Sequence, residues 1–351
     1  MHVKQFQEDL MNWYEKEARD LPWRRESSPY GIWVSEMMLQ QTRVETVIPY
    51  YNRFMKAFPD VFDLALGEED QLLKLWQGLG YYARARNLKK GAEIVVKNYQ
   101  GKMPEEREEL MKIPGVGPYV SSAIASMAFQ KPVVSMDGNL YRVLARLYLW
   151  EEEINGVHSK RALTQLAENL LHRERPGDFN QAMMDLGATI CIPNGAPLCD
   201  RCPVRKHCEA YSRGKTDSIP VKTVKKPRKI LDKTVFLVRY PNHVVLRKRP
   251  NQGLLASLWE FPNVDGHLSW KQAQHFLKLG GIMSLDFHEI GDSKHIFSHI
   301  EWRMKGYEIV LNDRILITDA FPYSQWQWVE VDMLHQEYSI PSAFRDYMKL
   351  L

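Results

Sequence analysis

The sequence contains no apolar run near the roughly 20 residues that a helix needs to span a bilayer. Residues 1–20 alternate charged and apolar side chains, so they predict no signal peptide. Cysteine is scarce, because the chain has only four and all of them lie between Cys191 and Cys208. This pattern argues against a membrane protein and against a secreted protein held by disulfides. We expect a cytoplasmic protein, associated with the nucleoid if it is bacterial.

Neither sign of charge dominates, since 47 Lys and Arg stand against 43 Asp and Glu and the net charge is +4. A net charge of this size permits nucleic-acid binding but does not require it. The length of 351 residues allows two domains of ordinary size, each with its own core.

Residues 1–212 are predicted to form a domain of short helices without strands. Apolar residues recur there at the spacing of an amphipathic helix. One such set is Leu140, Val143, Leu144 and Leu147. Residues 213–233 interrupt this pattern with eight Lys or Arg, two prolines and no aromatic residue, which is typical of a linker. This basic linker is either solvated or lies along DNA phosphates.

Residues 234–351 are predicted to form a second domain of the α+β class. The period changes there to runs rich in β-branched residues, as expected for strands. The predicted strands are 234–240, 244–248, 302–311 and 326–329. One helix is predicted to end within 277–281, and another to cover 341–351.

Residues 110–129 read as two helices joined by a Pro-Gly-Val-Gly turn. Gly115 and Gly117 let the backbone turn sharply and leave N–H groups unpaired at the start of the second helix. Such donors suit a DNA phosphate, although an ordinary helix–helix turn has the same spacing. Asp137 follows at the start of a further helix, where it is either an N-cap or a functional carboxylate.

Glu36 lies in an apolar predicted helix, WVSEMMLQQTRV, with Trp33 on the same helical face. Burial among apolar side chains raises the pKa of a carboxyl group, which suits a general acid. The alternative is a partly exposed glutamate that only favours the helix.

The cysteines are closely spaced, as Cys191-x7-Cys199-x2-Cys202-x5-Cys208. Four thiolates at such spacing suit either a [4Fe–4S] cluster or a structural zinc ion. A zinc ribbon usually has two Cys-x2-Cys pairs, whereas this chain has one, which favours the cluster. Arg201, Arg205 and Lys206 lie among the cysteines and suit phosphate contacts.

The string L-x-x-I-P-G-V-G, followed about 20 residues later by an Asp, resembles the helix–hairpin–helix DNA glycosylase superfamily. The clustered cysteines narrow the resemblance to endonuclease III and to the adenine glycosylases of the MutY family. The resemblance covers nearly the whole chain and is strongest in 23–42, 110–139 and 191–208. The second and third cysteine gaps match the family's cluster, while the first gap is one residue longer than is usual.

This resemblance implies an all-α helix–hairpin–helix glycosylase domain with a [4Fe–4S] cluster loop, joined by the linker to a Nudix-like α+β domain. It implies a monomer that acts on double-stranded DNA. By this resemblance Glu36 protonates adenine N7 and Asp137 stabilises the sugar cation that remains. Tyr119 occupies the position of the lysine with which bifunctional members form a Schiff base, so the resemblance implies a monofunctional enzyme.

The resemblance assigns roles to further residues. Tyr119 and Asn139 would orient Asp137 and the sugar. Gln41 would wedge into the duplex, and Tyr81 would intercalate beside 8-oxoguanine, although glycine-rich turns ending in tyrosines are also common in cores. Other residues that match family positions near the pocket are Arg24, Trp23 and Gln181. Without the resemblance, Arg24 would be interpreted as a surface cation.

The segment 245–262 resembles the start of a Nudix fold. The acidic metal-binding helix of Nudix hydrolases is missing, since 270–279 holds no acidic residue, so a reader role is expected in place of pyrophosphate hydrolysis. Phe297, Ser298 and His299 match the loop with which adenine glycosylases contact 8-oxoguanine. A hydroxyl there can hydrogen-bond where 8-oxoguanine differs from guanine. Without the resemblance these would be ordinary loop residues.

Together these features predict excision of adenine from A·8-oxoguanine pairs, and from A·G pairs, after the adenine nucleotide is flipped out of the duplex. Protonation turns adenine into a better leaving group, and a carboxylate stabilises the oxocarbenium-like sugar, as in glycoside hydrolysis. One alternative is a pyrimidine-lesion glycosylase/lyase of the endonuclease III kind, which Tyr119 disfavours. Two others are an inactive DNA-binding adaptor and a Nudix hydrolase.

Overall fold

The computed structural model describes residues 2–221, 223, 227–279, 282, 286–312 and 326–351. The chain forms two compact units. The first consists of Met1–Gly67 and Asn87–Val224, and the second of Glu68–Arg86 and Lys225–Leu351. Across the described part of the chain, no helix combines the length and the apolar character that a bilayer crossing requires.

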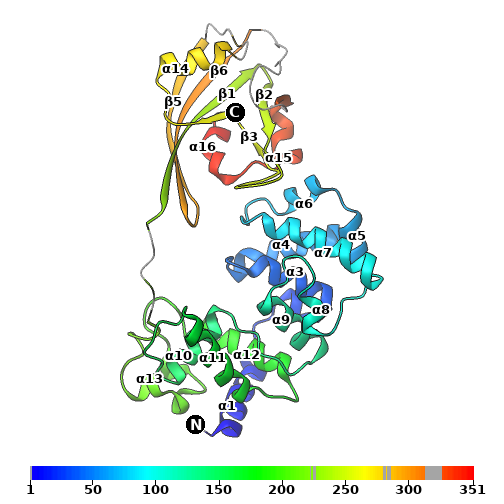
Figure 1. Ribbon diagram of the computed structural model, residues 1–351, viewed down its shortest axis with the longest axis vertical. Coiled ribbons are helices and arrows are strands. Elements are labelled where there is room, and N and C mark those ends of the chain that lie inside the picture. The colour runs from blue at the N-terminus through cyan, green and yellow to red at the C-terminus, as the bar shows by residue number, and fades with distance from the viewer. Residues whose placement is uncertain (1, 222, 224–226, 280–281, 283–285, 313–325) are drawn as a thin grey trace. The chain divides into compact units, whose positions relative to one another are not determined.

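The first unit is helical, as predicted (Figure 1). Helix α7 (Ala83–Tyr99) begins in the second unit and continues into the first. The other helices of the first unit are α1 (Val3–Glu17), α2 (Pro22–Arg25), α3 (Pro29–Leu39), α4 (Val44–Ala57), α5 (Val61–Leu66), α8 (Arg107–Leu110), α9 (Pro118–Phe129), α10 (Gly138–Leu147), α11 (Val157–Leu170), α12 (Pro176–Thr189), η1 (Cys199–Arg201), η2 (Arg205–His207) and α13 (Glu209–Ser212).

Helix α10 shows how the sequence pattern produces the core. Its apolar residues recur on one face, and all of the predicted set is buried: Leu140, Val143, Leu144 and Leu147. They share a cluster with Phe6 and Leu10 of α1 and with Phe179 of α12. Burying each such side chain stabilises the fold by about 1.5–3 kcal/mol. This cluster fixes the start of α10, where Asp137 is the N-cap.

Helix α3 is buried on nearly every side because other helices surround it. It begins after Ser28, whose hydroxyl accepts a hydrogen bond from the Gly31 N–H at 3.0 Å. Trp33 packs against α7 at Gly91, where an added Cβ would lie 2.6 Å from the indole. Glu36 is the acidic residue of this helix and is carried into the interior with its apolar neighbours.

The second unit contains a mixed sheet with the order β3-β2-β1-β6-β5, with β4 paired to β1 and β7 to β2. Its strands in the described residues are β1 (Lys229–Tyr240), β2 (His243–Lys248), β3 (Trp259–Glu260), β4 (Asn263–Asp265), β5 (Asp286–Ile296), β6 (Ile300–Val310) and β7 (Trp326–Glu330). Strands β1 and β6 are parallel, and the other paired strands are antiparallel. Its helices are α6 (Glu69–Leu75), α14 (Trp270–Leu279), η3 (Val331–Met333), α15 (Leu334–Glu337), η4 (Ser342–Phe344) and α16 (Arg345–Met348).

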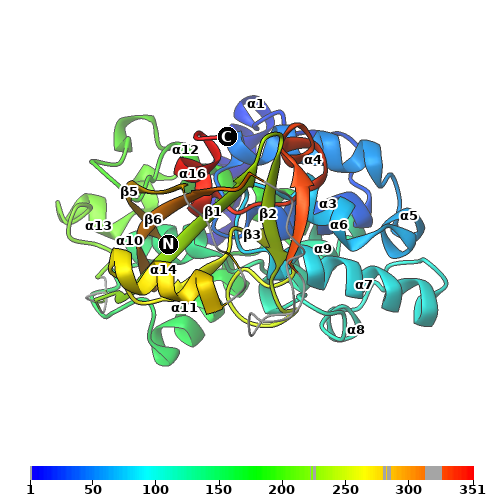
Figure 2. The same cartoon turned by 90° about the horizontal axis from the view of Figure 1, so that it is seen from above.

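Strand β1 is covered on both faces, which explains its unbroken run of buried residues. Val235 and Leu237 contribute to a cluster that contains Phe344 and Tyr347 of the C-terminal segment. The alternate residues Phe236 and Val238 point to the other face, where they join the cluster that contains α14 residues. Figure 2 shows α14 and α16 on opposite sides of the sheet.

Every strand predicted from the sequence is present, with β1 beginning at Lys229 in place of the predicted 234. The long strand β5 was not predicted. Its sequence, DFHEIGDSKHI, is polar, and its register shifts between Glu289 and Gly291. It lies at one end of the sheet order, where a strand needs fewer apolar residues. Helix α14 ends at Leu279, within the predicted range 277–281, of which Gly280–Gly281 lie outside the described residues.

Candidate active site

A cavity of about 460 Å³ in the first unit collects eight of the predicted site residues, including all four predicted catalytic ones. Its walls come from α2, α3, α9, α12 and the start of α10. The predicted residues that line it are Trp23, Arg24, Glu36, Gln41, Tyr119, Asp137, Asn139 and Gln181. These residues are far apart in the sequence, so the fold brings them to one cavity.

Glu36 is the most deeply buried acidic group of this cavity, with 3% of the residue exposed. Its carboxyl oxygen accepts a hydrogen bond from the Tyr119 hydroxyl at 2.6 Å. Burial raises the pKa of Glu36 to about 7, and the hydrogen bond from Tyr119 opposes part of this rise. The expected burial of Glu36 and the rise of its pKa are confirmed, and the alternative of a partly exposed helix residue is wrong.

Asp137 caps the start of α10 and also lines the cavity. One carboxyl oxygen accepts from the Leu140 N–H at 2.7 Å, and the other accepts from the Asn139 amide at 2.8 Å. Burial raises the pKa of Asp137, while these two hydrogen bonds favour the carboxylate. The cap therefore holds the carboxylate in a fixed orientation at the edge of the cavity.

Tyr119 makes a hydrogen bond that the sequence did not predict. The sequence interpretation had Tyr119 orient Asp137, but its hydroxyl donates to Glu36. Of Tyr119 and Asn139, it is Asn139 whose side chain donates a hydrogen bond to Asp137. The side chain of Tyr119 projects from α9 toward α3, which explains why it reaches Glu36.

Arg24 is not a free surface cation. Its guanidinium makes two hydrogen bonds to Asp185 of α12, both at 2.8 Å, and the Asp185 side chain is 1% exposed. Arg19 binds the same carboxylate through Nη2 at 2.6 Å. Burial opposes ionisation of Asp185, but its hydrogen bonds and ion pairs with the two arginines lower its pKa below the ordinary value. Asp185 has no local sequence signal, because its partners are more than 160 positions away.

Arg142 is a second residue that the sequence interpretation missed. Its guanidinium donates to the Asn139 side chain at 2.9 Å and to the Gly187 carbonyl at 2.7 Å. A third bond, from Nε, reaches the Cys191 carbonyl at 2.8 Å. Arg142 thus connects the amide that contacts Asp137 with the first cysteine of the cysteine segment.

Two residues expected to enter DNA have backbone conformations that are unusual for their type. Gln41 follows the end of α3 with a φ of 60°, and Tyr81 precedes α7 with a φ of 47°. Non-glycine residues in this left-handed region cost about 1–3 kcal/mol and concentrate at functional sites. Both residues are exposed, Tyr81 at 49%. Each therefore lies at an exposed turn.

The two glycines of the hairpin have different surroundings. Gly115 has a φ of 79°, and an added Cβ would lie 2.8 Å from Met37 and from Asn87. Gly117 is the N-cap of α9, and nothing lies within 4 Å of the position of an added Cβ. Gly115 is therefore required by packing, whereas Gly117 leaves open space before the first N–H groups of α9.

A second cavity, of about 360 Å³, lies in the second unit. Phe297, Ser298 and His299 form the turn between β5 and β6 and line this cavity. Tyr81, from the portion of the second unit that precedes α7, lines it too, and its hydroxyl is hydrogen-bonded to that of Ser298. Burial lowers the pKa of the neighbouring His295, which favours its neutral form.

All four cysteines line one cavity of about 30 Å³ in the first unit. Arg146 donates to the Cys191 sulfur at 3.2 Å from Nη1. Burial raises the pKa of Cys202 to about 12, because a thiolate loses its hydration there. Among the described residues, no group of three or more His, Cys, Asp or Glu side chains is arranged to hold a single metal ion. Four soft donors around one enclosed space have the chemistry that an iron–sulfur cluster requires.

The basic residues near the cysteines are partly engaged in ion pairs. Lys206 contacts Asp9 at 2.9 Å, and Arg205 contacts Asp200 at 3.1 Å. Both cations are exposed, although Asp9 is only 19% exposed, and ion pairs at the surface contribute about 0–1 kcal/mol. These cations therefore remain able to exchange partners with a phosphate.

Comparisons with known proteins agree with the two-part organisation. A family model described as HhH-GPD superfamily base excision DNA repair protein matches residues 34–172, and one described as NUDIX domain matches residues 234–350. A curated protein of Mus musculus, "Adenine DNA glycosylase", is 36% identical over 98% of this chain and 78% of its own length. The protein of that name from Buchnera aphidicola subsp. Baizongia pistaciae is 37% identical over 88% of this chain and 86% of its own length.

Solved structures resemble the helical part. A thermostable thymine-DNA glycosylase is 30% identical, with a TM-score of 0.53 over 60% of this chain and 97% of that chain. A non-covalent endonuclease III–DNA complex has a TM-score of 0.52 over 61% of this chain and 98% of that chain. Its identity of 21% supports a shared fold only.

Proposed function

Because the chain belongs to the adenine DNA glycosylase family, and is therefore a DNA N-glycosylase of base excision repair, we propose that it excises adenine mispaired with 8-oxoguanine. Adenine mispaired with guanine is the second proposed substrate. One observation carries the proposal. A single cavity contains the buried Glu36, which accepts a hydrogen bond from Tyr119, and Asp137, which is the N-cap of α10.

Glu36 is the proposed general acid. A carboxyl group with a pKa of about 7 is about half protonated at pH 7 and largely protonated at lower pH, so it can donate a proton to a ring nitrogen of adenine. The Tyr119 hydroxyl fixes one carboxyl oxygen of Glu36, which leaves the other oxygen to carry the proton. Protonated adenine leaves the sugar more readily because it departs as a neutral base.

Asp137 is the proposed stabiliser of the sugar cation. Departure of the base leaves positive charge at the sugar, and the carboxylate held by Leu140 and Asn139 needs no rearrangement to face it. Glycoside hydrolases likewise use one carboxylic acid to protonate the leaving group and one carboxylate that acts at the sugar. A water molecule then adds to C1′ of the sugar cation and loses a proton, which completes the hydrolysis and leaves an abasic site.

The enzyme is proposed to be monofunctional. Tyr119 offers a phenol whose pKa lies well above its ordinary value, because it is buried and lies beside Glu36 and Asp137. A neutral phenol cannot form the Schiff base through which a lysine amine permits strand cleavage. Borohydride should therefore trap no covalent protein–DNA adduct.

The adenine nucleotide is proposed to be flipped into the cavity of the first unit. Gln41 and Tyr81 are the proposed wedge residues, since both are exposed at strained turns. The N–H groups that follow Gly117 are proposed to bind a phosphate oxygen. Open space at Gly117 supports this, because a phosphate could approach the backbone closely.

Ser298 and its neighbours Phe297 and His299 are the proposed readers of 8-oxoguanine. The Ser298 hydroxyl can donate to an acceptor or accept from a donor, and 8-oxoguanine differs from guanine in both. Its contact with Tyr81 supports a shared site, because the proposed intercalating residue and the proposed reader line one cavity.

A [4Fe–4S] cluster is the proposed cofactor of the four cysteines. Cys191, Cys199, Cys202 and Cys208 would hold it. When bound, it supplies a redox-capable, positively charged iron centre that keeps the thiolates ionised. Anaerobically purified protein should contain about four irons per chain with visible absorbance. One equivalent of zinc and no iron would contradict this assignment.

The proposed function is tested with duplexes that contain A·8-oxoguanine, A·G or A·T, followed by alkali to cut abasic sites. Strand cleavage is expected in the first duplex, less in the second and none in the third. No abasic site in the A·8-oxoguanine duplex would refute the proposal. The same duplexes with borohydride test the endonuclease III alternative, which predicts a trapped adduct.

A further inference from the structure

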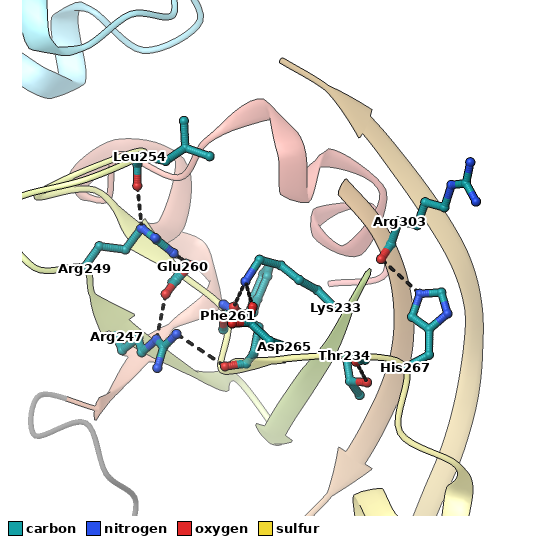
Figure 3. A network of polar contacts seen from close by, with 12 residues as sticks. Lys233, Thr234, Arg247, Arg249, Leu254, Glu260, Phe261, Asp265, His267 and Arg303 are labelled. Atoms are coloured by element: carbon teal, nitrogen blue, oxygen red, sulfur yellow. Dashed lines mark hydrogen bonds and ion pairs between the residues drawn. The ribbon is translucent and has the colours of Figure 1, made fainter. Parts of the chain in front are cut away.

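Glu260 of β3 is a buried charge in the second unit, with 1% of its side chain exposed. It accepts a hydrogen bond from Arg247 Nε at 2.7 Å and another from Arg249 Nη1 at 2.5 Å (Figure 3). A buried carboxylate is strongly destabilising unless it is paired in this way. Two arginines from the end of β2 and the residues after it therefore share one anion.

The two arginines differ in what else they contact. Arg247 Nη2 donates to the Asn263 carbonyl at 3.3 Å, at the start of β4. Arg249 Nε donates to the Leu254 carbonyl at 3.0 Å. Figure 3 shows these bonds running from Glu260 through each guanidinium to a different part of the backbone. Only the second of them leads into the loop 250–257.

The loop 250–257 is one wall of the cavity proposed to read 8-oxoguanine. Leu254 and Leu255 line that cavity. Leu255 and Ser257 have φ values of 58° and 61°, which are unfavourable for residues with a Cβ. Backbone bonds close the ends of the loop, one of them from the Ser257 N–H to the Pro250 carbonyl at 3.0 Å. The Arg249 side chain reaches the middle of the loop.

Arg249 also contacts Trp302, which supports the opposite wall of this cavity. Its guanidinium lies over the Trp302 ring at 5.9 Å from the centroid. Trp302 in turn packs edge-on against Phe297, with ring centroids 5.0 Å apart. Phe297 belongs to the turn that holds Ser298. One guanidinium thus connects a buried anion, the loop 250–257 and the base of the reader turn.

We propose that Arg249, held by Glu260, is a positioning residue that fixes the two walls of this cavity and so determines the preference for 8-oxoguanine over guanine opposite adenine. Arg249 acts through Leu254 and Trp302 and does not itself touch the base. The inference rests on the proposed reading of 8-oxoguanine by Ser298.

The chain offers a matched control in Arg247. Arg247→Met and Arg249→Met each remove one of the two cationic partners of Glu260, so both should lower stability. Only Arg249→Met also releases the Leu254 carbonyl. A purely structural role of the ion-pair group predicts the same effect of both variants on base preference. A positioning role of Arg249 predicts an effect of one variant only.

Arg249→Lys is a further variant that separates charge from geometry. Lysine keeps a positive charge beside Glu260, but its single ammonium lacks the planar fork that lets arginine bond Glu260 and Leu254 together. Arg249→Lys is therefore expected to fold and still to lose base preference. This variant keeps the proposal testable if Arg249→Met does not fold.

The experiment measures the Kd for duplexes in which a non-hydrolysable 2′-fluoro adenine nucleotide lies opposite 8-oxoguanine or guanine. The readout is the ratio of the two Kd values, with Tm recorded for each variant. We expect Arg249→Met and Arg249→Lys to reduce the wild-type ratio roughly tenfold, the effect of one lost charge-assisted hydrogen bond. Arg247→Met should leave the ratio within about twofold of wild type.

An unchanged ratio in both Arg249 variants would overturn the inference while leaving the proposed function intact. An equal fall in Arg247→Met would also overturn it, since the effect would then follow from general loss of stability. A wild-type ratio near one would instead refute the proposed reading of 8-oxoguanine, and the inference with it.

Discussion

In the first unit Glu36 is buried and Tyr119, Asp137 and Asn139 are partly buried, whereas in the second unit Ser298 and His299 lie exposed at the turn between β5 and β6. Burial changes the chemistry of a group, since it raises the pKa of Glu36 by removing water from the carboxylate. Exposure leaves the chemistry of a hydroxyl unchanged and makes it available to a partner. This difference fits the proposed division, in which the first cavity carries out the reaction and the second recognises the base opposite adenine.

The largest expected effect follows from Asp137. Asp137→Asn keeps a side chain that can cap α10, so the fold should persist. It removes the negative charge that faces the sugar, and single-turnover excision should fall roughly 10³-fold. Binding of the A·8-oxoguanine duplex, measured by fluorescence anisotropy, should remain. Excision near the wild-type rate would show that the first cavity is not the reaction site.

Asp185, which pairs with the cavity residues Arg24 and Arg19, tests whether a buried charge must be paired. Asp185→Asn should destabilise the protein by about 3–5 kcal/mol, because Arg24 and Arg19 lose a shared partner. Urea unfolding followed by circular dichroism measures this loss. Asp178→Asn is the matched control, since Asp178 lies on the same helix but pairs with Arg175 in an exposed position. It should cost less than about 1 kcal/mol. Equal losses would contradict the contrast between buried and exposed pairs.

Glu36 should make stability depend on pH. Its folded-state pKa of about 7 lies above the ordinary value of 4.5, so the folded protein holds the proton more tightly than the unfolded chain. Its contribution to stability is full below about pH 4.5 and is lost as pH rises to about 7, by roughly 3 kcal/mol in all. Glu36→Gln should remove this decline. Parallel stability curves of the two proteins between pH 5 and 8 would argue against a buried acid.

Ser298 gives the smallest expected effect. Ser298→Ala should reduce the preference for 8-oxoguanine over guanine by roughly fivefold, the effect of one neutral hydrogen bond of about 1 kcal/mol. Excision from the A·G duplex should change little. Ser293→Ala, in the same β5–β6 hairpin, serves as the control because Ser293 lies outside the cavity and contacts Asp346. A larger fall on A·G than on A·8-oxoguanine would contradict a reading role.

The sequence was informative where function depends on short motifs. Asp137 beside a helix start, Glu36 in an apolar helix and the hairpin glycines are all local patterns, and the structure brings Glu36 and Asp137 to one cavity. Contacts that join distant segments left no such signal. Asp185 reads as an ordinary helix residue until α2 is seen to place Arg24 against it.

The same reasoning explains what the sequence did not predict. The family resemblance assigned Tyr119 to orient Asp137, whereas the hydrogen bond of its hydroxyl to Glu36 depends on how α9 packs on α3. Strand β5 was missed because an edge strand can be polar. The partners of Glu260 also had no local sequence signal, because Arg247 reaches this carboxylate only when β2 pairs with β3.

The most direct test is the pH dependence of single-turnover adenine excision from an A·8-oxoguanine duplex, measured for the wild type and for Glu36→Gln. A carboxyl proton donor with a pKa of about 7 predicts a wild-type rate that falls tenfold per unit above that pH. Glu36→Gln should be roughly 10²–10⁴-fold slower and lack this decline. A Glu36→Gln variant as fast as the wild type, with the same pH profile, would contradict the account.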